Sequence, residues 1–352
     1  MRTRILRGGG HWATIGPAWR TVAEGRPVRS FMGSAAWAEA ISEAGRADNA
    51  RWVVVDDDEG ALAVLPLEVR RRTRGPVGLR LLVNDRTSDG VVADRARPAE
   101  LRAAVLAAMA DQAEPVDVVD LRGLRDGWGL LRLAVAGSQG LVTEVNHGGH
   151  SVVDTDRTSE QWTAAAGKNL RAALRKAGNR SARAGALTVT EATDAEGLDA
   201  ALDEFVAIES SGWKAGTGAL SNRPAQEAVM RHFLRASAAA GAAADGSVAI
   251  RTLRLDGRPA AAQITFHAHD TLDLLKVAYD DELSDLSPSN LLMADLVRSC
   301  CDRTDVARID LVTRQPWHER WRPTVLPTYR SRDPHLRRPG GLGLRLAAAV
   351  RG

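Results

Sequence analysis

Three consecutive strand-like segments that run directly into a helix constrain the fold of this chain more than any other feature. The segments span residues 247–255, 260–269 and 272–279. The turns between them, Asp256-Gly257 and His269-Asp270, are so short that neighbouring strands must pair antiparallel. The middle segment alternates small or apolar residues with polar ones, which is the period-two pattern of a strand. We therefore expect an antiparallel meander, then a helix at 289–302 and a strand at 307–312.

Helix and strand patterns continue on the N-terminal side of this meander. Helices are predicted at 34–44, 98–110, 160–183 and 194–210, and between the cap Asn222 and Gly241. Strands are predicted at 51–56, 60–69, 116–121, 140–144 and 187–191, and a last one follows the meander near 328–331. This order indicates an α/β (α+β) protein whose sheets are mixed, mostly antiparallel and flanked by helices.

The length of 352 residues predicts more than one lobe, because single cores rarely grow beyond roughly 250 residues. The polar segment 146–160 contains two glycines, and we interpret it as the boundary. We expect an N-terminal lobe at 1–150, a C-terminal lobe at 151–335 and a basic, glycine-rich tail at 336–352. His147 and His150 lie in the boundary segment with no third ligand nearby, so we expect a solvated linker there and no metal site.

Composition favours a cytoplasmic protein. No apolar run approaches the roughly 20 residues that a membrane-spanning helix needs. Gly8-Gly9-Gly10 stands where a signal peptide would be apolar. The only cysteines, Cys300 and Cys301, are adjacent, which is no disulfide framework and fits two small core residues. A net charge of +3 is too small to require a nucleic-acid partner.

The segment Ser287-Pro288-Ser289-Asn290 leads from the meander into the helix at 289–302. Either serine is able to cap that helix, and proline presets the backbone of its first turn. The free N–H groups and the dipole at such an N-terminus suit an anion, for example a pyrophosphate. A plain helix cap is the alternative interpretation.

Basic residues gather on the helix at 160–183. Lys168, Arg171 and Arg175 lie outside its apolar face, and the chain has only four lysines, all between residues 168 and 276. A solvated helix face is one interpretation. A binding surface for an anionic polymer or for the phosphate group of a ligand is the other.

Several motifs resemble the Gcn5-related N-acetyltransferase (GNAT) superfamily. The closest resemblance is to its CelD-type branch, which is related to the Fem-type aminoacyltransferases. The resemblance covers residues 155–330 well and rests on five stretches. They are Lys168-Asn169-Leu170-Arg171, Glu209-Ser210-Ser211-Gly212-Trp213-Lys214, Leu255-Asp256-Gly257-Arg258-Pro259, Lys276-Val277-Ala278-Tyr279-Asp280 and Ser287-Pro288 with Leu291-Leu292. It implies tandem GNAT-like lobes, of which the N-terminal one is a degenerate copy.

The resemblance also implies a binding site for the donor. An acyl group would lie against the strand around Leu275 and Val277, and the pantetheine arm would run toward a short segment at the start of the next helix. That segment contains Ser287, Ser289, Asn290 and Leu291. Proteins of the branch often carry Ser-Pro-Gly where this chain has serine at position 289, whose Cβ restricts the approach of a phosphate to the backbone.

Catalytic roles follow from what acyl transfer requires: a base for the amine and an acid for the leaving thiolate. Glu209 is the candidate base, with a surface helix carboxylate as the alternative. Tyr279 is the candidate acid, unless it only packs. Lys276 would bind a substrate carboxylate or form an ion pair with Asp273 or Asp280.

Further residues are candidates for binding the acceptor. They are Trp213 and Lys214, Gln263 and His267 on the polar side of the middle strand, and Lys168, Arg171 and Arg175 on the basic helix. Solvated strand histidines are the alternative for His267.

Together these features predict an N-acyltransferase that uses acetyl-CoA or another acyl-CoA and no metal. Its acceptor would be the amine of a small molecule, peptide or saccharide. An aminoacyl-tRNA-dependent transferase, with tRNA as partner, is the first alternative. A non-catalytic accessory protein of polysaccharide biosynthesis is the second.

Overall fold

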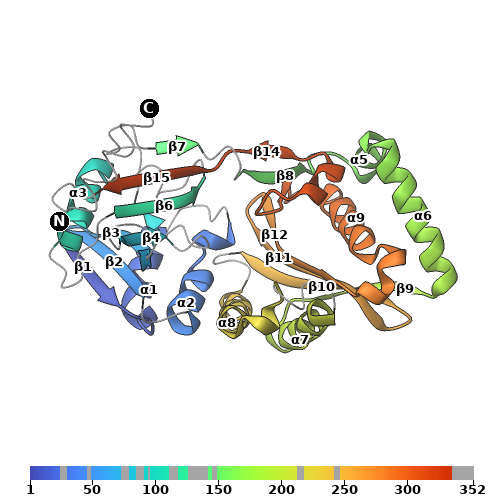
Figure 1. Ribbon diagram of the computed structural model, residues 1–352, viewed down its shortest axis with the longest axis horizontal. Coiled ribbons are helices and arrows are strands. Elements are labelled where there is room, and N and C mark those ends of the chain that lie inside the picture. The colour runs from blue at the N-terminus through green and yellow to red at the C-terminus, as the bar shows by residue number, and fades with distance from the viewer. Residues whose placement is uncertain are drawn as a thin grey trace. The chain divides into compact units, whose positions relative to one another are not determined.

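The computed structural model describes residues 1–23, 30–45, 49–72, 79–84, 91–93, 96–110, 118–125, 142–144, 149–211, 218–241 and 246–334. They form two compact units, each built around its own sheet (Figure 1). The first unit comprises the described residues within Met1–Arg26, Trp37–Gly149 and Pro327–Gly352. The second comprises those within Pro27–Ala36 and His150–Leu326. Each unit is therefore discontinuous in sequence.

The sheet of the first unit has the strand order β1-β2-β3-β4-β6-β15-β7, and β5 pairs with β3. Its strands are β1 (Arg2–Arg7), β2 (Ala50–Asp57), β3 (Gly60–Arg72), β4 (Leu79–Asn84), β5 (Val91–Val92), β6 (Val118–Leu124), β7 (Val142–Glu144) and β15 (Tyr329–Pro334). Its helices are α1 (Trp12–Ala23), most of α2 (Ala35–Ala44) and α3 (Pro98–Ala110). The core between sheet and helices is built from aliphatic side chains such as Val53, Leu65 and Leu101.

The sheet of the second unit has the order β14-β8-β13-β12-β11-β10-β9. Its strands are β8 (His150–Asp154), β9 (Leu187–Ala192), β10 (Ser247–Leu255), β11 (Arg258–Ala268), β12 (Thr271–Tyr279), β13 (Arg308–Asp310) and β14 (Thr324–Leu326). Its helices are η1 (Phe31–Gly33), α5 (Ser159–Ala165), α6 (Lys168–Ala184), α7 (Ala195–Ser211), η3 (Leu220–Asn222), α8 (Pro224–Ala240), η4 (Asp281–Leu286), α9 (Pro288–Cys301) and η5 (Pro316–Trp321). The meander predicted from the sequence is β10–β11–β12, so that prediction is confirmed.

The two units share one arrangement. In each, three antiparallel strands lead to a helix and then to a strand that pairs parallel with the third. In the first unit these are β2–β3–β4, α3 and β6, and in the second they are β10–β11–β12, α9 and β13. The tandem architecture expected from the sequence is confirmed.

Helices cover both faces of the second sheet. Helices α7 and α8 lie on one face and α9 on the other (Figure 1). On the first face Phe266 of β11 packs against Phe233 of α8, with ring centroids 5.8 Å apart. On the second face Gln263 contacts Met293 of α9. The period-two alternation of β11 thus sets which helix each side chain meets.

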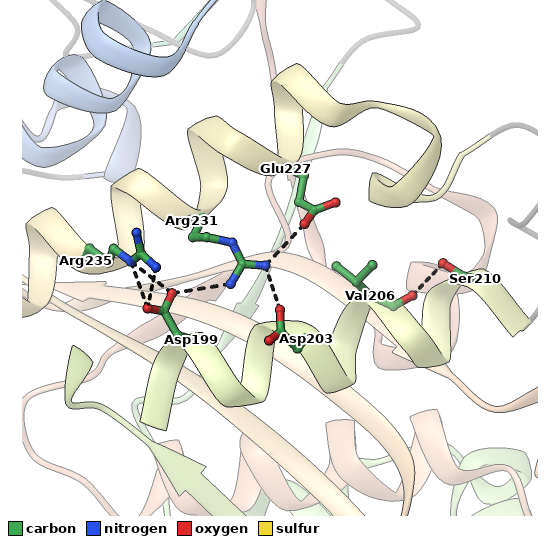
Figure 2. A network of polar contacts seen from close by, with 7 residues as sticks. All are labelled: Asp199, Asp203, Val206, Ser210, Glu227, Arg231 and Arg235. Atoms are coloured by element: carbon green, nitrogen blue, oxygen red, sulfur yellow. Dashed lines mark hydrogen bonds and ion pairs between the residues drawn. The ribbon is translucent and has the colours of Figure 1, made fainter. Parts of the chain in front are cut away.

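An ionic network joins α7 to α8 (Figure 2). Arg231 of α8 lies 2.7 Å from Asp203 of α7 and 3.4 Å from Asp199, and it also contacts Glu227 on its own helix. Burial works against the charged form of Arg231, but hydrogen bonds to Asp203 and Glu227 outweigh burial and raise its pKa. The network therefore fixes the pairing of the two helices that cover the first face.

The structure corrects three expectations from the sequence. The single helix expected at 160–183 is two helices, because Ala166 and Gly167 leave the helical conformation between α5 and α6. The segment around His150 is not a solvated linker but the buried strand β8. Asn222 does not cap α8, whose N-cap residue is Arg223. Cys300 and Cys301 are buried core thiols, as expected, and burial raises the pKa of Cys300 to about 12.

Candidate functional site

The second sheet has a break in regularity in the middle of β12. Ile264 of β11 pairs with Lys276, whereas Thr265 pairs with Leu274, so Leu275 is an extra residue opposite the β11 ladder. Such a β-bulge bends a strand and redirects its backbone groups, and bulges are common next to active sites. Leu275, which the sequence singled out, therefore lies at an irregular point of the central strand.

The ladder between β12 and β13 ends a little before this bulge. The strands pair in parallel only from Thr271–Arg308 to Asp273–Asp310, and β12 then continues to Tyr279. In sheets with parallel strands, ligands bind at the carboxyl ends of the strands, where neighbouring strands separate. The end of the β12–β13 ladder and the Leu275 bulge thus mark the candidate site.

Strand alternation distributes the predicted residues over two faces. Lys276 lies opposite Ile264 and shares the face covered by α7 and α8. Val277 and Tyr279 lie opposite Gln263 and Ala261 and share the face covered by α9. The predicted catalytic side chains therefore do not form one cluster.

On the face of α7, Lys276 and Glu209 form an ion pair. Nζ of Lys276 donates to Oε1 of Glu209 at 3.1 Å, and the backbone N–H of Leu220 donates to Oε2 at 2.7 Å. The Glu209 side chain is fully buried. Glu209 is not the surface carboxylate that was one alternative, and Lys276 is not paired with Asp273 or Asp280. Asp280 instead binds Arg258, and Asp273 accepts from the N–H of Phe31.

Three further polar residues lie on the same face, and the sequence did not identify them as a site. Asp273 and Asp310 are register partners in β12 and β13, and His150 is two residues from Val152, the β8 partner of Asp310. Nδ1 of His150 lies 2.9 Å from Oδ2 of Asp310. The only local signal was that Asp273 and Asp310 interrupt apolar strands, which does not reveal their pairing.

On the α9 face the predicted residues lie mainly in the core. Tyr279 and Leu291 pack partly buried against Leu253, Ala261 and Leu292. Gln263 is fully buried and donates to the sulfur of Met293 at 3.9 Å, so it does not reach toward solvent to orient a substrate.

His267 lies at the far end of β11, where it pairs with Leu272 rather than with the residues around the bulge. Its Nε2 lies 3.1 Å from the carbonyl oxygen of Asp305, and its Nδ1 lies 3.3 Å from Arg303. A hydrogen bond from Arg303 lowers the pKa of Asp305 to about 2. His267 thus belongs to a separate charged group and is not brought together with Lys276.

The N-terminus of α9 follows Ser287, which adopts the left-handed conformation with φ 52° and ψ 50°. Ser287 occupies the N-cap position but its side chain makes no capping hydrogen bond, contrary to expectation. Asn290 accepts a hydrogen bond from Arg320 of η5 at 2.9 Å. A guanidinium therefore lies at the positive end of the α9 dipole, where a cation is unfavourable unless an anion joins it.

Helix α6 presents the basic residues found in the sequence. Lys168, Arg171 and Arg175 are exposed, opposite the buried stripe formed by Leu170, Leu174 and Ala177. Arg171 donates to the carbonyl of Ala164 at 2.6 Å, and α6 forms no ion pair with any described carboxylate. Most other arginines of this unit are paired, as in Arg231–Asp203 and Arg258–Asp280. Trp213 and Lys214 lie outside the described residues.

Within the described residues, no group of three or more His, Cys, Asp or Glu side chains is arranged to hold a metal ion. No described helix combines the length and apolar character needed to cross a membrane.

Comparison with known proteins agrees with the geometry of the second unit. Residues 168–322 match the sequence family described as acetyltransferase (GNAT) domain, and this span includes the bulge, α9 and the basic helix. No curated protein matches the chain significantly.

Solved structures match nearly the whole chain. The C-terminal domain of a putative lysylphosphatidylglycerol synthetase from Agrobacterium fabrum is 14% identical, with a TM-score of 0.55 and 96% of both chains covered. FemX is 14% identical, with a TM-score of 0.55 over 94% of this chain and 96% of FemX. A tandem GNAT protein from the clavulanic acid biosynthesis pathway is 13% identical, with a TM-score of 0.50 over 95% and 98%. At such identities the similarity concerns the fold. The chain has a fold similar to that of these tandem GNAT structures, and its residues 168–322 match the GNAT acetyltransferase family.

Proposed function

We propose that the protein transfers an acyl group from an acyl-CoA thioester to an amine. The observation that carries the proposal is the β-bulge at Leu275, next to the end of the β12–β13 ladder and inside the GNAT domain. A bulge redirects backbone N–H groups, and such groups are able to polarise a thioester carbonyl as negative charge develops on its oxygen.

The start of α9 supports coenzyme A as the carrier. Arg320, held by Asn290, places a positive charge beside the N-terminal N–H groups of the helix, and both favour a pyrophosphate. We assign Ser287, Ser289, Asn290 and Leu291 to this part of the donor site, with Val277 and Leu275 along the acyl arm. Tyr279, which packs against the same small cluster as Leu291, is our candidate acid for the leaving thiolate.

Glu209 and Lys276 take a different role in this proposal. Glu209 already accepts hydrogen bonds from Lys276 and from the N–H of Leu220. Both oxygens of this buried carboxylate are thus engaged by donors of the protein itself. We therefore assign the pair to holding the bulged strand in place against α7.

Calorimetric titration with acetyl-CoA tests the proposal. Binding should be measurable, and Arg320→Ala should weaken it roughly tenfold through loss of a charge-assisted contact to phosphate. Arg298→Ala is the matched control, because Arg298 is an exposed arginine near the other end of α9. If acetyl-CoA at millimolar concentration does not bind, the proposal fails.

Aminoacyl transfer from tRNA is a second candidate, favoured by the six basic and no acidic residues of α6. Its first turn lacks both a side-chain cap and an acidic residue, which leaves the positive helix end without compensation. We expect charged tRNA to bind with a steep salt dependence. The double variant Arg175→Ala, Lys176→Ala should reduce that salt dependence. The acceptor would again be an amine, as in acyl transfer from acyl-CoA.

These two residues are better probes than Arg171, whose guanidinium is engaged by Ala164. Arg298→Ala again serves as the control for loss of one arginine. Binding that is absent, or independent of salt, would exclude this candidate.

A further inference from the structure

His150 and Asp310 form a buried pair at the end of β13. Their side chains are each 8% exposed, and Nδ1 of His150 lies 2.9 Å from Oδ2 of Asp310. The contact has the distance of an ion pair, but Nδ1 does not form a hydrogen bond. The carboxylate is thus close enough to orient the imidazole ring.

The turn after β13 fixes Asp310. Its Oδ1 accepts from the N–H of Val312 at 2.7 Å, and the N–H of Thr313 reaches back to the carbonyl of Leu311 at 2.6 Å. Val312, a β-branched residue, is thereby held at φ 61°. Backbone conformations of this kind persist only where the surroundings enforce them, and they concentrate at functional sites.

His318 reinforces the same turn. Its ring is buried and accepts a hydrogen bond from the N–H of Gln315 at 3.3 Å. Burial lowers the pKa of His318 to about 4, against the opposing influence of a hydrogen bond to the backbone of Thr313 and of the nearby Glu319 and Asp310. His318 is therefore neutral near pH 7 and leaves Asp310 available to His150.

His150 offers an imidazole beside the end of the β12–β13 ladder. Asp273 accepts from the backbone of Phe31, and Glu209 is paired with Lys276. Among the described residues, no hydrogen bond is made by Nε2 of His150. Imidazole is also the side chain best matched to proton transfer near neutral pH.

From this geometry we infer that His150, oriented by Asp310, accepts the proton of the attacking amine; the inference rests on the proposed acyl transfer. The amine nitrogen forms a bond to the thioester carbonyl carbon, and the carbon–sulfur bond breaks. The proton leaves nitrogen for Nε2 of His150, and Tyr279 donates a proton to the thiolate, which departs as the thiol. Proton exchange with solvent then restores His150 and Tyr279 to their starting forms. Asp310 stays ionised and acts as a positioning residue.

The test measures thiol release from acetyl-CoA with a set of primary amines, namely an α-amino acid, a polyamine and an amino sugar, between pH 5.5 and 9. His150→Gln should lower kcat/KM about 100-fold or more, with little change in the KM for acetyl-CoA. Asp310→Asn should move the acidic limb of the kcat/KM profile to lower pH, because imidazolium loses its counter-charge. A purely structural pair would lower the rate without moving that limb. His269→Asn, in an exposed turn, is the control.

The outcomes separate the two proposals. If the unmodified protein transfers acetyl to none of the amines, the proposed function fails and the base assignment fails with it. The unmodified protein could instead be active while His150→Gln keeps kcat/KM within about threefold, or while the acidic limb of Asp310→Asn does not move. Either result overturns only the assignment of His150 as the base. Should His150→Gln fail to fold, the Asp310→Asn profile decides, together with an NMR titration of the His150 imidazole, whose midpoint should fall in that variant. An unchanged midpoint would overturn the pairing on which the inference depends.

Discussion

Lys276 of β12 donates a hydrogen bond to Glu209 of α7 at 3.1 Å, and this pair attaches the bulged strand to a helix on one face of the sheet. The second carboxylate oxygen accepts the N–H of Leu220 in η3. One buried side chain thus joins β12 to α7 and η3, which precede it in sequence, immediately next to Leu275.

Breaking this pair from one side should destabilise the fold. Lys276→Met leaves the buried Glu209 carboxylate with only the N–H of Leu220 as a partner among the two named here. We therefore expect the free energy of unfolding to fall by about 3 kcal/mol. This is the lower end of the range for buried pairs, because the Lys276 side chain is 24% exposed. Adding Glu209→Gln to that variant should recover most of the loss. Urea unfolding midpoints of the two variants provide the measurement. A double variant no more stable than Lys276→Met would contradict the prediction.

Stability should depend on pH through His318. Burial lowers the pKa of its imidazole from 6.5 to about 4, so the unfolded chain binds a proton that the folded chain does not between these values. The free energy of unfolding should be highest above pH 6.5, fall as the pH drops toward 4, and level off below pH 4. The total loss should be about 1–2 kcal/mol after allowance for solvent screening. His318→Gln should abolish this part of the pH dependence. Chemical unfolding at pH 7.5 and pH 5 compares the two proteins, and equal losses in both would refute the assignment to His318.

Much of the fold followed from local sequence signals. Alternation and tight turns were sufficient to predict β10, β11 and β12, because strand pairing across a short turn is a local event. The expected helix at 98–110 matches α3, because the hydrogen bonds of a helix are also local in sequence. β8 escaped prediction because its place in the sheet depends on its partners β13 and β14, which lie far along the chain and leave no pattern around His150.

The candidate site was predicted less completely than the fold. The motif around Lys276 indicated the correct strand, but the partner of Lys276 is set by the packing of α7, which no local pattern encodes. The Leu275 bulge reverses the alternation of β12 and so determines which face Lys276 occupies. Pairing of His150 with Asp310 requires the full strand order, which only the structure gives.

Glycine in place of Ser287 should stabilise the protein. Ser287 adopts φ 52° and ψ 50°, which costs a residue with a Cβ about 1 kcal/mol, and its hydroxyl makes no capping bond that would be lost. We expect Ser287→Gly to be more stable by up to about 1 kcal/mol, less the entropy that glycine gains in the unfolded chain. Thermal unfolding alongside Ser287→Ala, which keeps the Cβ, gives the comparison. A glycine variant less stable than the alanine variant would show that the serine side chain contributes a contact.

Two glycines of the second unit should respond in opposite ways to alanine. Gly246 precedes β10 at φ 113°, and a Cβ there would lie 2.4 Å from the backbone oxygen of His267. That oxygen belongs to the central meander and is unable to move aside, so Gly246→Ala should cost about 2–4 kcal/mol. Gly178 lies inside α6, where a Cβ meets nothing within 4 Å, so Gly178→Ala should add up to about 1 kcal/mol of helix propensity. Urea unfolding of both variants tests the pair. A neutral Gly246→Ala would mean that β10 and β11 adjust their register more easily than their continuous pairing from Ser247 to Leu253 implies.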